Sequence, residues 1–129
     1  MKGYLLDTAV ALQGITAPDD LSRRIRKSVD EGPAFLSLIS YWEVMIKSMK
    51  GKLDVGDARR WYYETLDILA LQPLTLRPEH ISTISTLPAL HHDPFDRALI
   101  AQAITEDLTL LTTDTIIPKY ASPEFRVIR

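Results

Sequence analysis

Four acidic residues lie where strand-like segments of this chain give way to helical ones. They are Asp7, Glu43, Asp96 and Asp114. Asp7 and Asp114 each follow a short apolar run, whereas Glu43 and Asp96 lie in the first turn of an expected helix. The carboxyl ends of parallel strands share one edge of a sheet, and ligands bind in the crevice there. We therefore expect these carboxylates, distant in sequence, to converge on one site.

Such a cluster has a characteristic chemistry. Neighbouring carboxylates repel one another, and some stay protonated unless a cation lies between them. Mg²⁺ and Mn²⁺ prefer carboxylate and water oxygens, and they can activate water and stabilise both the attacking and the leaving oxygen of a phosphodiester. A bound cation would also let a chain of net charge −2 hold a polyanion. The pattern predicts phosphodiester hydrolysis without a covalent intermediate.

Helix capping is the simpler interpretation of some of these acids. Carboxylates at helix N-termini accept hydrogen bonds from free N–H groups. The segment around Asp93 fits this view, with Asp93 as N-cap and Pro94 as first helical residue. Taken singly, Asp7 and Asp114 fit it too. Asp96 does not, because it falls among the apolar positions of its own helix, where a carboxylate needs a cation or donors.

The remaining pattern favours an α/β domain with a largely parallel sheet. Strands are expected at 3–6, 34–38, 71–76, 109–112 and 125–128, of which the third is short or at an edge because of Pro73. Helices are expected from residue 8 onward, over 23–30, between residues 40 and 51, and over 58–69, 78–87 and 94–106.

Ser40 and Glu43 have the spacing of a capping box, which makes Ser40 the expected N-cap of the third helix. Behind them, Trp42, Met45 and Met49 follow a helical stripe. Such a stripe is typical of a core or a dimer interface rather than of base-stacking residues.

Composition narrows the class of protein. The 129 residues suit a single domain, 1–129, and the absence of cysteine excludes disulfides and thiolate metal sites. No apolar run approaches the roughly 20 residues of a membrane span, and the charge at Asp7 comes too early for a signal-peptide core, so we expect a cytoplasmic protein without membrane association. The glycine motifs of serine hydrolases, P-loop proteins and Rossmann folds are missing.

The acidic residues lie in segments that resemble the PIN-domain family, specifically the bacterial VapC-type toxins. The matching segments are 4–8, 40–47 with 51–53, 92–103 and 110–114. They occur in the family's order and with similar gaps, so the resemblance covers essentially the whole chain. Leu-Leu-Asp-Thr alone would be no evidence, whereas Asp-Pro-Phe-Asp-Arg together with the other segments is specific.

The resemblance implies a three-layer α/β/α fold with a mainly parallel central sheet. It implies an endoribonuclease toxin dependent on Mg²⁺ or Mn²⁺, neutralised by a cognate antitoxin and assembled as a homodimer. The residues implied as metal ligands are Asp7, Glu43, Asp96 and Asp114, with Thr8, Asp93 and Thr112 in support. One departure is Ala9, where many relatives carry Asn or His.

Other functional interpretations stay open. Lys47 and Arg97 could contact phosphates of an RNA substrate, or lie on solvated helix faces. The basic segment 23–27 could border the groove or bind antitoxin acids, although solvation is the simpler interpretation. His91 and His92 are expected in a polar loop rather than as joint ligands, and His80 on a surface helix.

Two other functions compete with the ribonuclease. A non-catalytic PIN-like scaffold that binds RNA or protein is the alternative, against which the complete set of acids argues. A structure-specific DNA nuclease shares the acidic chemistry, but the chain is too short for large DNA-clamping insertions.

Overall fold

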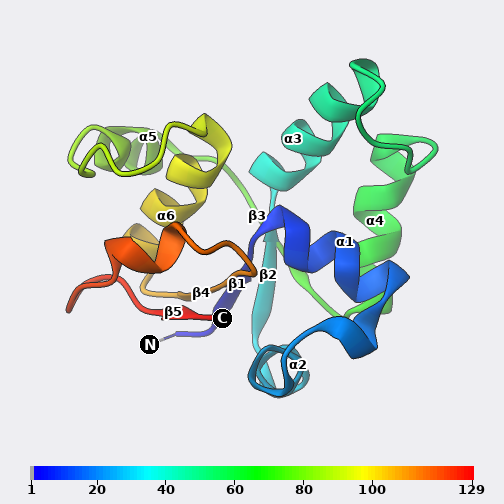
Figure 1. Ribbon diagram of the computed structural model, residues 1–129, viewed down its shortest axis with the longest axis horizontal. Helices are drawn as coiled ribbons and strands as arrows, with labels where there is room; N and C mark the ends of the chain where they lie inside the picture. Colours follow the sequence, from blue (N-terminus) through cyan, green and yellow to red (C-terminus); the bar gives the residue numbers. More distant parts are fainter. Residues whose placement is uncertain (1) are drawn as a thin grey trace.

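The computed structural model describes residues 2–129 and contains a five-stranded sheet in which every pairing is parallel. In the order in which they lie side by side (Figure 1), the strands are β3 (Gln72–Leu74), β2 (Ala34–Ser37), β1 (Tyr4–Leu6), β4 (Thr109–Leu111) and β5 (Val127–Ile128). The predicted parallel sheet is confirmed. Pro73 lies in the edge strand β3, as expected of a residue that has no N–H to donate.

Helices connect these strands and cover both faces of the sheet. They are α1 (Thr8–Thr16), α2 (Arg23–Glu31), α3 (Leu38–Met49), α4 (Ala58–Ile68), α5 (Pro78–Ile84) and α6 (Pro94–Glu106), with short 3-10 helices at Pro18–Asp20 and Ile117–Tyr120. Of the six, α6 has the bounds that the sequence predicts, and α5 ends earlier than predicted. No helix within residues 2–129 is long and apolar enough to cross a membrane.

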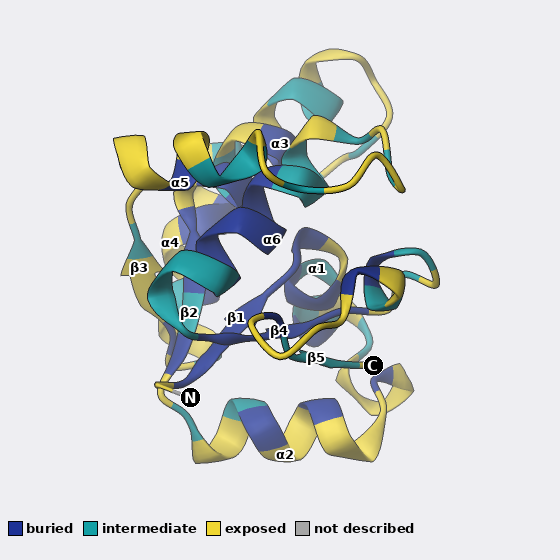
Figure 2. Ribbon diagram, turned by 90° about the vertical axis from the view of Figure 1, so that its left-hand side faces the viewer, coloured by how far each residue is buried: buried dark blue, intermediate teal, exposed yellow. Residues whose placement is uncertain are grey.

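Side chains alternate between two cores, one on each face of the sheet. Leu6 and Leu111 pack with Val10 of α1 and Trp61 of α4. Their strand neighbours Leu5 and Leu110 pack on the opposite face, together with the apolar side of α6. β1 and β4 are therefore buried on both faces, whereas α2 is largely exposed (Figure 2). This arrangement confirms the three-layer α/β/α fold.

The predicted cap of the third helix is wrong. α3 begins at Leu38, because the hydroxyl of Ser37 accepts the backbone N–H of Ile39 at 2.9 Å and ends the strand at that point. Ser40 lies inside the helix, fully buried, with its hydroxyl 2.8 Å from that of Thr8. Glu43 consequently lies in the second turn of α3 and not in the first.

The apolar stripe of α3 does not belong to the core. Trp42 is 54% exposed and Met49 77% exposed, and Met45 is also exposed. The ring of Trp42 meets that of Phe95, which borders the second core, edge to face at a centroid distance of 5.1 Å. The core interpretation of this stripe is therefore wrong for the single chain, and the dimer interface stays a prediction.

The prediction for His80 is also wrong, since this residue is fully buried rather than on the surface. Its Nε2 lies 2.8 Å from Oε2 of Glu106, and its Nδ1 accepts the backbone N–H of Arg77 at 3.0 Å. Because Glu106 ends α6 and Arg77 precedes α5, this histidine joins the two helices. Its role is structural, and the sequence interpretation failed because the contact partner is distant in the chain.

Candidate active site

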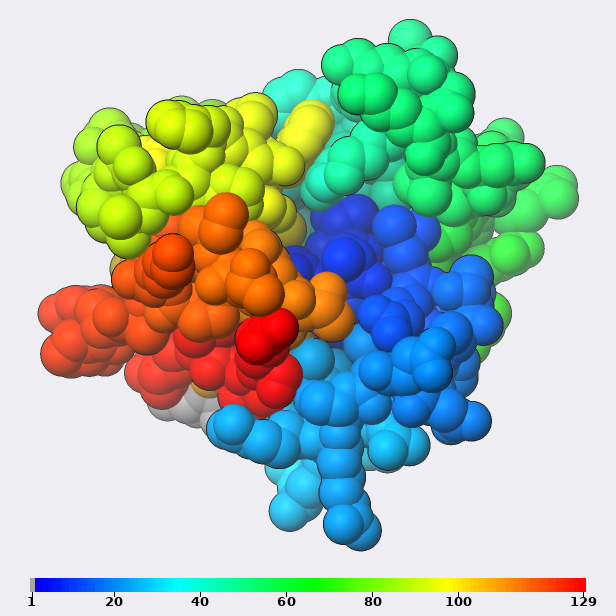
Figure 3. All heavy atoms as spheres, viewed as in Figure 1, coloured from blue at the N-terminus to red at the C-terminus, as the bar shows by residue number. Residues whose placement is uncertain are grey.

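A cavity of about 160 Å³ opens at the carboxyl edge of β1 and β4. It brings together all four acids singled out from the sequence, and its lining comprises Asp7, Thr8, Ala9, Leu12, Glu43, Lys47, Asp93, Asp96, Thr113 and Asp114. In Figure 3 the blue N-terminal segment lies between the cyan segment of α3, the yellow segment of α6 and the orange segment that follows β4. The site is thus assembled from segments across the whole chain.

Asp7 both caps α1 and lines the cavity. Its Oδ1 accepts the backbone N–H of Val10 at 2.8 Å, and its Oδ2 accepts the hydroxyl of Thr112. The residue is only 3% exposed. Burial raises the pKa of Asp7 to about 6, and the charges of Glu43 and Asp114 act in the same direction, although the two hydrogen bonds oppose them. Asp7 can therefore serve both as the N-cap of α1 and as a residue of the site.

Glu43 carries a buried oxygen that lacks a partner. Its Oε2 accepts a hydrogen bond from Nζ of Lys47 at 2.7 Å, which also raises the pKa of Lys47. Within residues 2–129, no donor reaches the other oxygen, Oε1, although Glu43 is only 3% exposed. An unsatisfied buried carboxylate oxygen is costly, and a hard cation is the partner that such an oxygen prefers.

Asp96 and Asp114 meet at His91. Nε2 of His91 lies 2.8 Å from Oδ2 of Asp96 and 3.1 Å from Oδ2 of Asp114. One ligand atom from each of the three residues lies within 4.8 Å of the others. Burial raises the pKa of Asp96 to about 7, with the charges of Asp93, Glu43 and Asp7 adding to the effect, while His91 lowers it.

The sequence correctly predicted a loop at His91 but did not predict its contact with Asp96 and Asp114. Residue 91 lies in the loop just before Asp93, the N-cap of α6, so its side chain can reach the first turn of that helix. His92 is exposed, which agrees with the expectation that the two histidines do not ligate together. Proximity to the cap was the available signal, but the contact with Asp114 comes only from the fold.

The supporting residues hold the acids and their helices. Thr112 accepts the backbone N–H of Asp114 at 2.9 Å, in addition to donating to Asp7. Asp93 accepts the backbone N–H groups of Phe95 and Asp96, at 2.9 and 3.2 Å, as the predicted cap of α6. Thr8, bonded to Ser40, connects α1 with α3.

Arg97 does not line the cavity. Its guanidinium donates to the backbone carbonyls of Pro88, Ile84 and Leu87, at 2.8, 3.2 and 3.3 Å, and these bonds tie the end of α5 and the following loop to α6. The structure therefore gives no geometric support for a phosphate contact by Arg97. Lys47 does line the cavity, with its ammonium group on Glu43.

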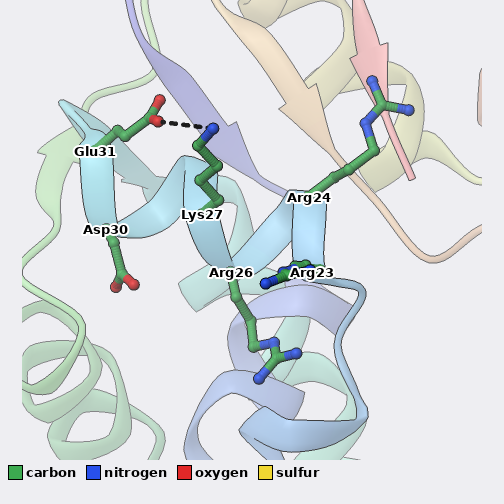
Figure 4. A pocket seen from close by; sticks show the side chains of 6 residues that line it. All are labelled: Arg23, Arg24, Arg26, Lys27, Asp30 and Glu31. Atoms are coloured by element: carbon green, nitrogen blue, oxygen red, sulfur yellow. Dashed lines mark ion pairs between the residues drawn. The ribbon is translucent and has the colours of Figure 1, made fainter.

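The basic segment of α2 lies apart from the acids. Its side chains leave the helix in different directions (Figure 4) and none of them lines the acidic cavity. Arg26 lies 3.9 Å from Asp19, and Lys27 lies 3.8 Å from Glu31. Both pairs are exposed, so these charges are mostly solvated.

The residues present fit a divalent cation. The donor set consists of carboxylate oxygens, which suit Mg²⁺ and Mn²⁺. Burial, together with the charges of the neighbouring acids, raises the pKa values of Asp7 and Asp96, and Oε1 of Glu43 lacks a hydrogen-bond partner among the described residues. The arrangement is suited to binding a metal ion and, through it, a phosphate group.

Several solved structures that this chain resembles in fold come from toxin–antitoxin systems. The chain superposes on DNA-bound VapBC from Salmonella typhimurium with a TM-score of 0.71, at 16% identity over 99% of this chain and 98% of the other. VapBC2 from Rickettsia felis, bound to a promoter DNA fragment, gives 0.70 at 18% identity, with coverages of 97% and 96%. VapBC-5 from Mycobacterium tuberculosis gives 0.66 at 16% identity, with coverages of 100% and 99%.

At these identities the superpositions establish the fold alone. No curated protein sequence matches the chain. The model of the PIN domain family, by contrast, matches residues 4–123, which is nearly the whole chain and includes all four acids of the cavity. The resemblance seen in the sequence is confirmed, and the chain belongs to the PIN domain family.

Proposed function

We propose that this protein is an endoribonuclease that requires Mg²⁺ or Mn²⁺ and is the toxin of a toxin–antitoxin pair. The observation that carries the proposal is the convergence of four carboxylates on one cavity, where Oε1 of Glu43 is buried and receives no hydrogen bond from residues 2–129. This arrangement is unfavourable for an isolated chain and favourable for one that binds a divalent ion.

Asp7, Glu43, Asp96 and Asp114 would hold the ion. When bound, the ion supplies the positive charge that activates a water and stabilises the developing charge on the phosphate and leaving oxygen. Thr112 and Thr8 keep the strand and helix ends in place, and Asp93 caps the helix that carries Asp96. Lys47, at the border of the cavity, offers a positive charge both to Glu43 and to a neighbouring phosphate.

The proposed partners are an RNA substrate, a cognate antitoxin and a second copy of the chain. The solved structures of similar fold are toxin–antitoxin complexes, which supports the antitoxin. The exposed apolar side chains Trp42, Met45 and Met49 on α3 support a homodimer, since a soluble monomer rarely exposes such a row. We place the activity in the cytoplasm, where cellular RNA is available.

Cleavage of a mixed RNA pool by the purified, antitoxin-free protein tests the proposal. The reaction is run with Mg²⁺, with Mn²⁺ and with EDTA, beside single-stranded DNA of matched length. RNA cleavage that requires either metal is the expected result. RNA binding without cleavage in any metal, from protein shown to be folded, would favour the scaffold, and preferential cleavage of DNA would favour the DNA nuclease.

A further inference from the structure

His91 lies between two of the proposed metal ligands. Its side chain is only 17% exposed and its Nε2 is within hydrogen-bonding distance of both Asp96 and Asp114. These acids come from different parts of the fold, Asp96 from α6 and Asp114 from the loop after β4. The imidazole of His91 therefore lies between the acid carried by α6 and the acid that follows β4.

The other ring nitrogen determines what Nε2 can do. Nδ1 of His91 accepts the backbone N–H of Asp93 at 3.3 Å, so it presents a lone pair and carries no hydrogen. The ring hydrogen then lies on Nε2, which is hydrogen-bonded to Asp114 and lies close to Asp96. A nitrogen that carries a hydrogen has no lone pair for a metal ion, so this geometry makes His91 a hydrogen-bond donor rather than a ligand.

The hydrogen bond from His91 restricts how Asp114 turns, and the same nitrogen lies close to Asp96. In Asp114, Oδ2 faces His91 while Oδ1 accepts the backbone N–H of Ile116 at 3.1 Å, so both oxygens have a set direction. Oδ2 of Asp96 lies 2.8 Å from the same nitrogen, a close electrostatic contact. A donor shared by two like-charged groups also reduces their repulsion, which keeps them close enough to bind one ion.

We propose that His91 is a positioning residue of the metal site, which orients Asp96 and Asp114 through Nε2–H without ligating the ion. The inference rests on the proposed function, because it assigns a role toward the ion that this function requires. It also assigns different roles to two adjacent histidines, since His92 is exposed and His91 is not.

The test measures Mn²⁺ binding by electron paramagnetic resonance for four proteins: the wild type, His91→Leu, His91→Gln and His92→Leu. His91→Leu removes the donor and is expected to weaken Mn²⁺ affinity by about 10- to 100-fold, as removal of such outer partners does. His91→Gln places an amide N–H near the position of Nε2 and should restore most of the affinity. His92→Leu is the matched control and should bind as the wild type does.

The same samples show whether a nitrogen is bound directly. Electron spin echo modulation of the wild-type Mn²⁺ complex is expected to lack the coupling of a directly bound ¹⁴N. Strong ¹⁴N coupling that disappears in His91→Leu would overturn the inference, because His91 would then be a ligand. Unchanged affinity in a folded His91→Leu protein would overturn it as well. A wild-type protein that binds no Mn²⁺ would reject the proposed function itself, a result distinct from both.

Discussion

The hydroxyl of Thr112 donates a hydrogen bond to Asp7 and accepts the backbone N–H of Asp114. One side chain thus joins two acids that lie near opposite ends of the chain. The connection follows from the parallel pairing of β1 and β4, in which Leu6 lies beside Leu111 and the next residues leave the sheet together. These two hydrogen bonds hold Asp7 and Asp114 in fixed positions at the ends of β1 and β4.

Replacement of Thr112 by Val tests how much these two hydrogen bonds stabilise the protein. Val has the shape of Thr but no hydroxyl, so it leaves the buried oxygen of Asp7 and the N–H of Asp114 without their partner. We expect the free energy of unfolding to fall by about 2 kcal/mol in urea denaturation with EDTA. Thr112→Ser keeps the hydroxyl and should recover most of the loss; equal stability of the Val and Ser variants would contradict the role of the hydroxyl.

Asp96 should destabilise the metal-free protein at neutral and higher pH. Its pKa is raised from 3.8 to about 7 in the folded chain, so the folded state binds the proton more tightly than the unfolded state. The contribution of Asp96 to stability is therefore greatest at low pH and is lost as the pH rises from 3.8 to about 7. Asp96→Asn removes the charge and should raise the free energy of unfolding at pH 8 by roughly 2 kcal/mol, a value reduced for its partial exposure.

Urea denaturation of wild type and Asp96→Asn in EDTA, from pH 5 to pH 8, measures this difference. The advantage of the variant should shrink steadily toward pH 5. A difference that stays constant with pH would show that the Asp96 carboxylate does not titrate in this interval.

Protons and metal ions should compete for the site. The pKa values of Asp7 and Asp96, about 6 and about 7, mean that both acids bind protons in the metal-free protein below neutral pH. An ion must displace these protons, so Mn²⁺ affinity should rise with pH between about 5 and 8 and then level off. Calorimetry in two buffers of different ionisation enthalpy counts the protons released; an affinity independent of pH across this range would refute the assignment.

The nature of the nucleophile can be tested with the substrate instead of the protein. If water attacks the phosphorus, the ribose 2′-hydroxyl forms no bond in the reaction. After the cleavage site has been mapped, an RNA with a single 2′-deoxynucleotide at that site should still be cut. Loss of cleavage, together with 2′,3′-cyclic phosphate ends on the unmodified RNA, would point to attack by the 2′-hydroxyl.

Much of this fold could be predicted where local chemistry decides the structure. Pro94 can begin a helix but cannot continue one, and Asp93 before it supplies the cap, so the start of α6 follows from two adjacent residues. The apolar runs at β1 and β4 also predict buried strands from local sequence, because these runs are too short to form helices. The convergence of the acids then follows from the parallel sheet.

Where the sequence interpretation failed, partners distant in the chain decide the result. Ser37 and Ser40 are both good caps, and the length of the strand before them, set by pairing with β1 and β3, selects Ser37. His80 becomes buried because it meets Glu106, and His91 enters the site because it meets Asp114. None of these contacts has a local signal in the sequence.

The most direct test of the account is the rate of RNA cleavage by wild type and Glu43→Gln in saturating Mn²⁺, with circular dichroism to show that both are folded. The amide of this variant keeps the size of the side chain but removes the negative charge that the proposed ion requires, and it alters Oε1, the oxygen that has no hydrogen-bond partner among the described residues. A fall in rate of about 100-fold or more is expected, equal to about 3 kcal/mol of transition-state stabilisation. Cleavage by Glu43→Gln at the wild-type rate would contradict the account, because the acidic cavity would then not be the site of reaction.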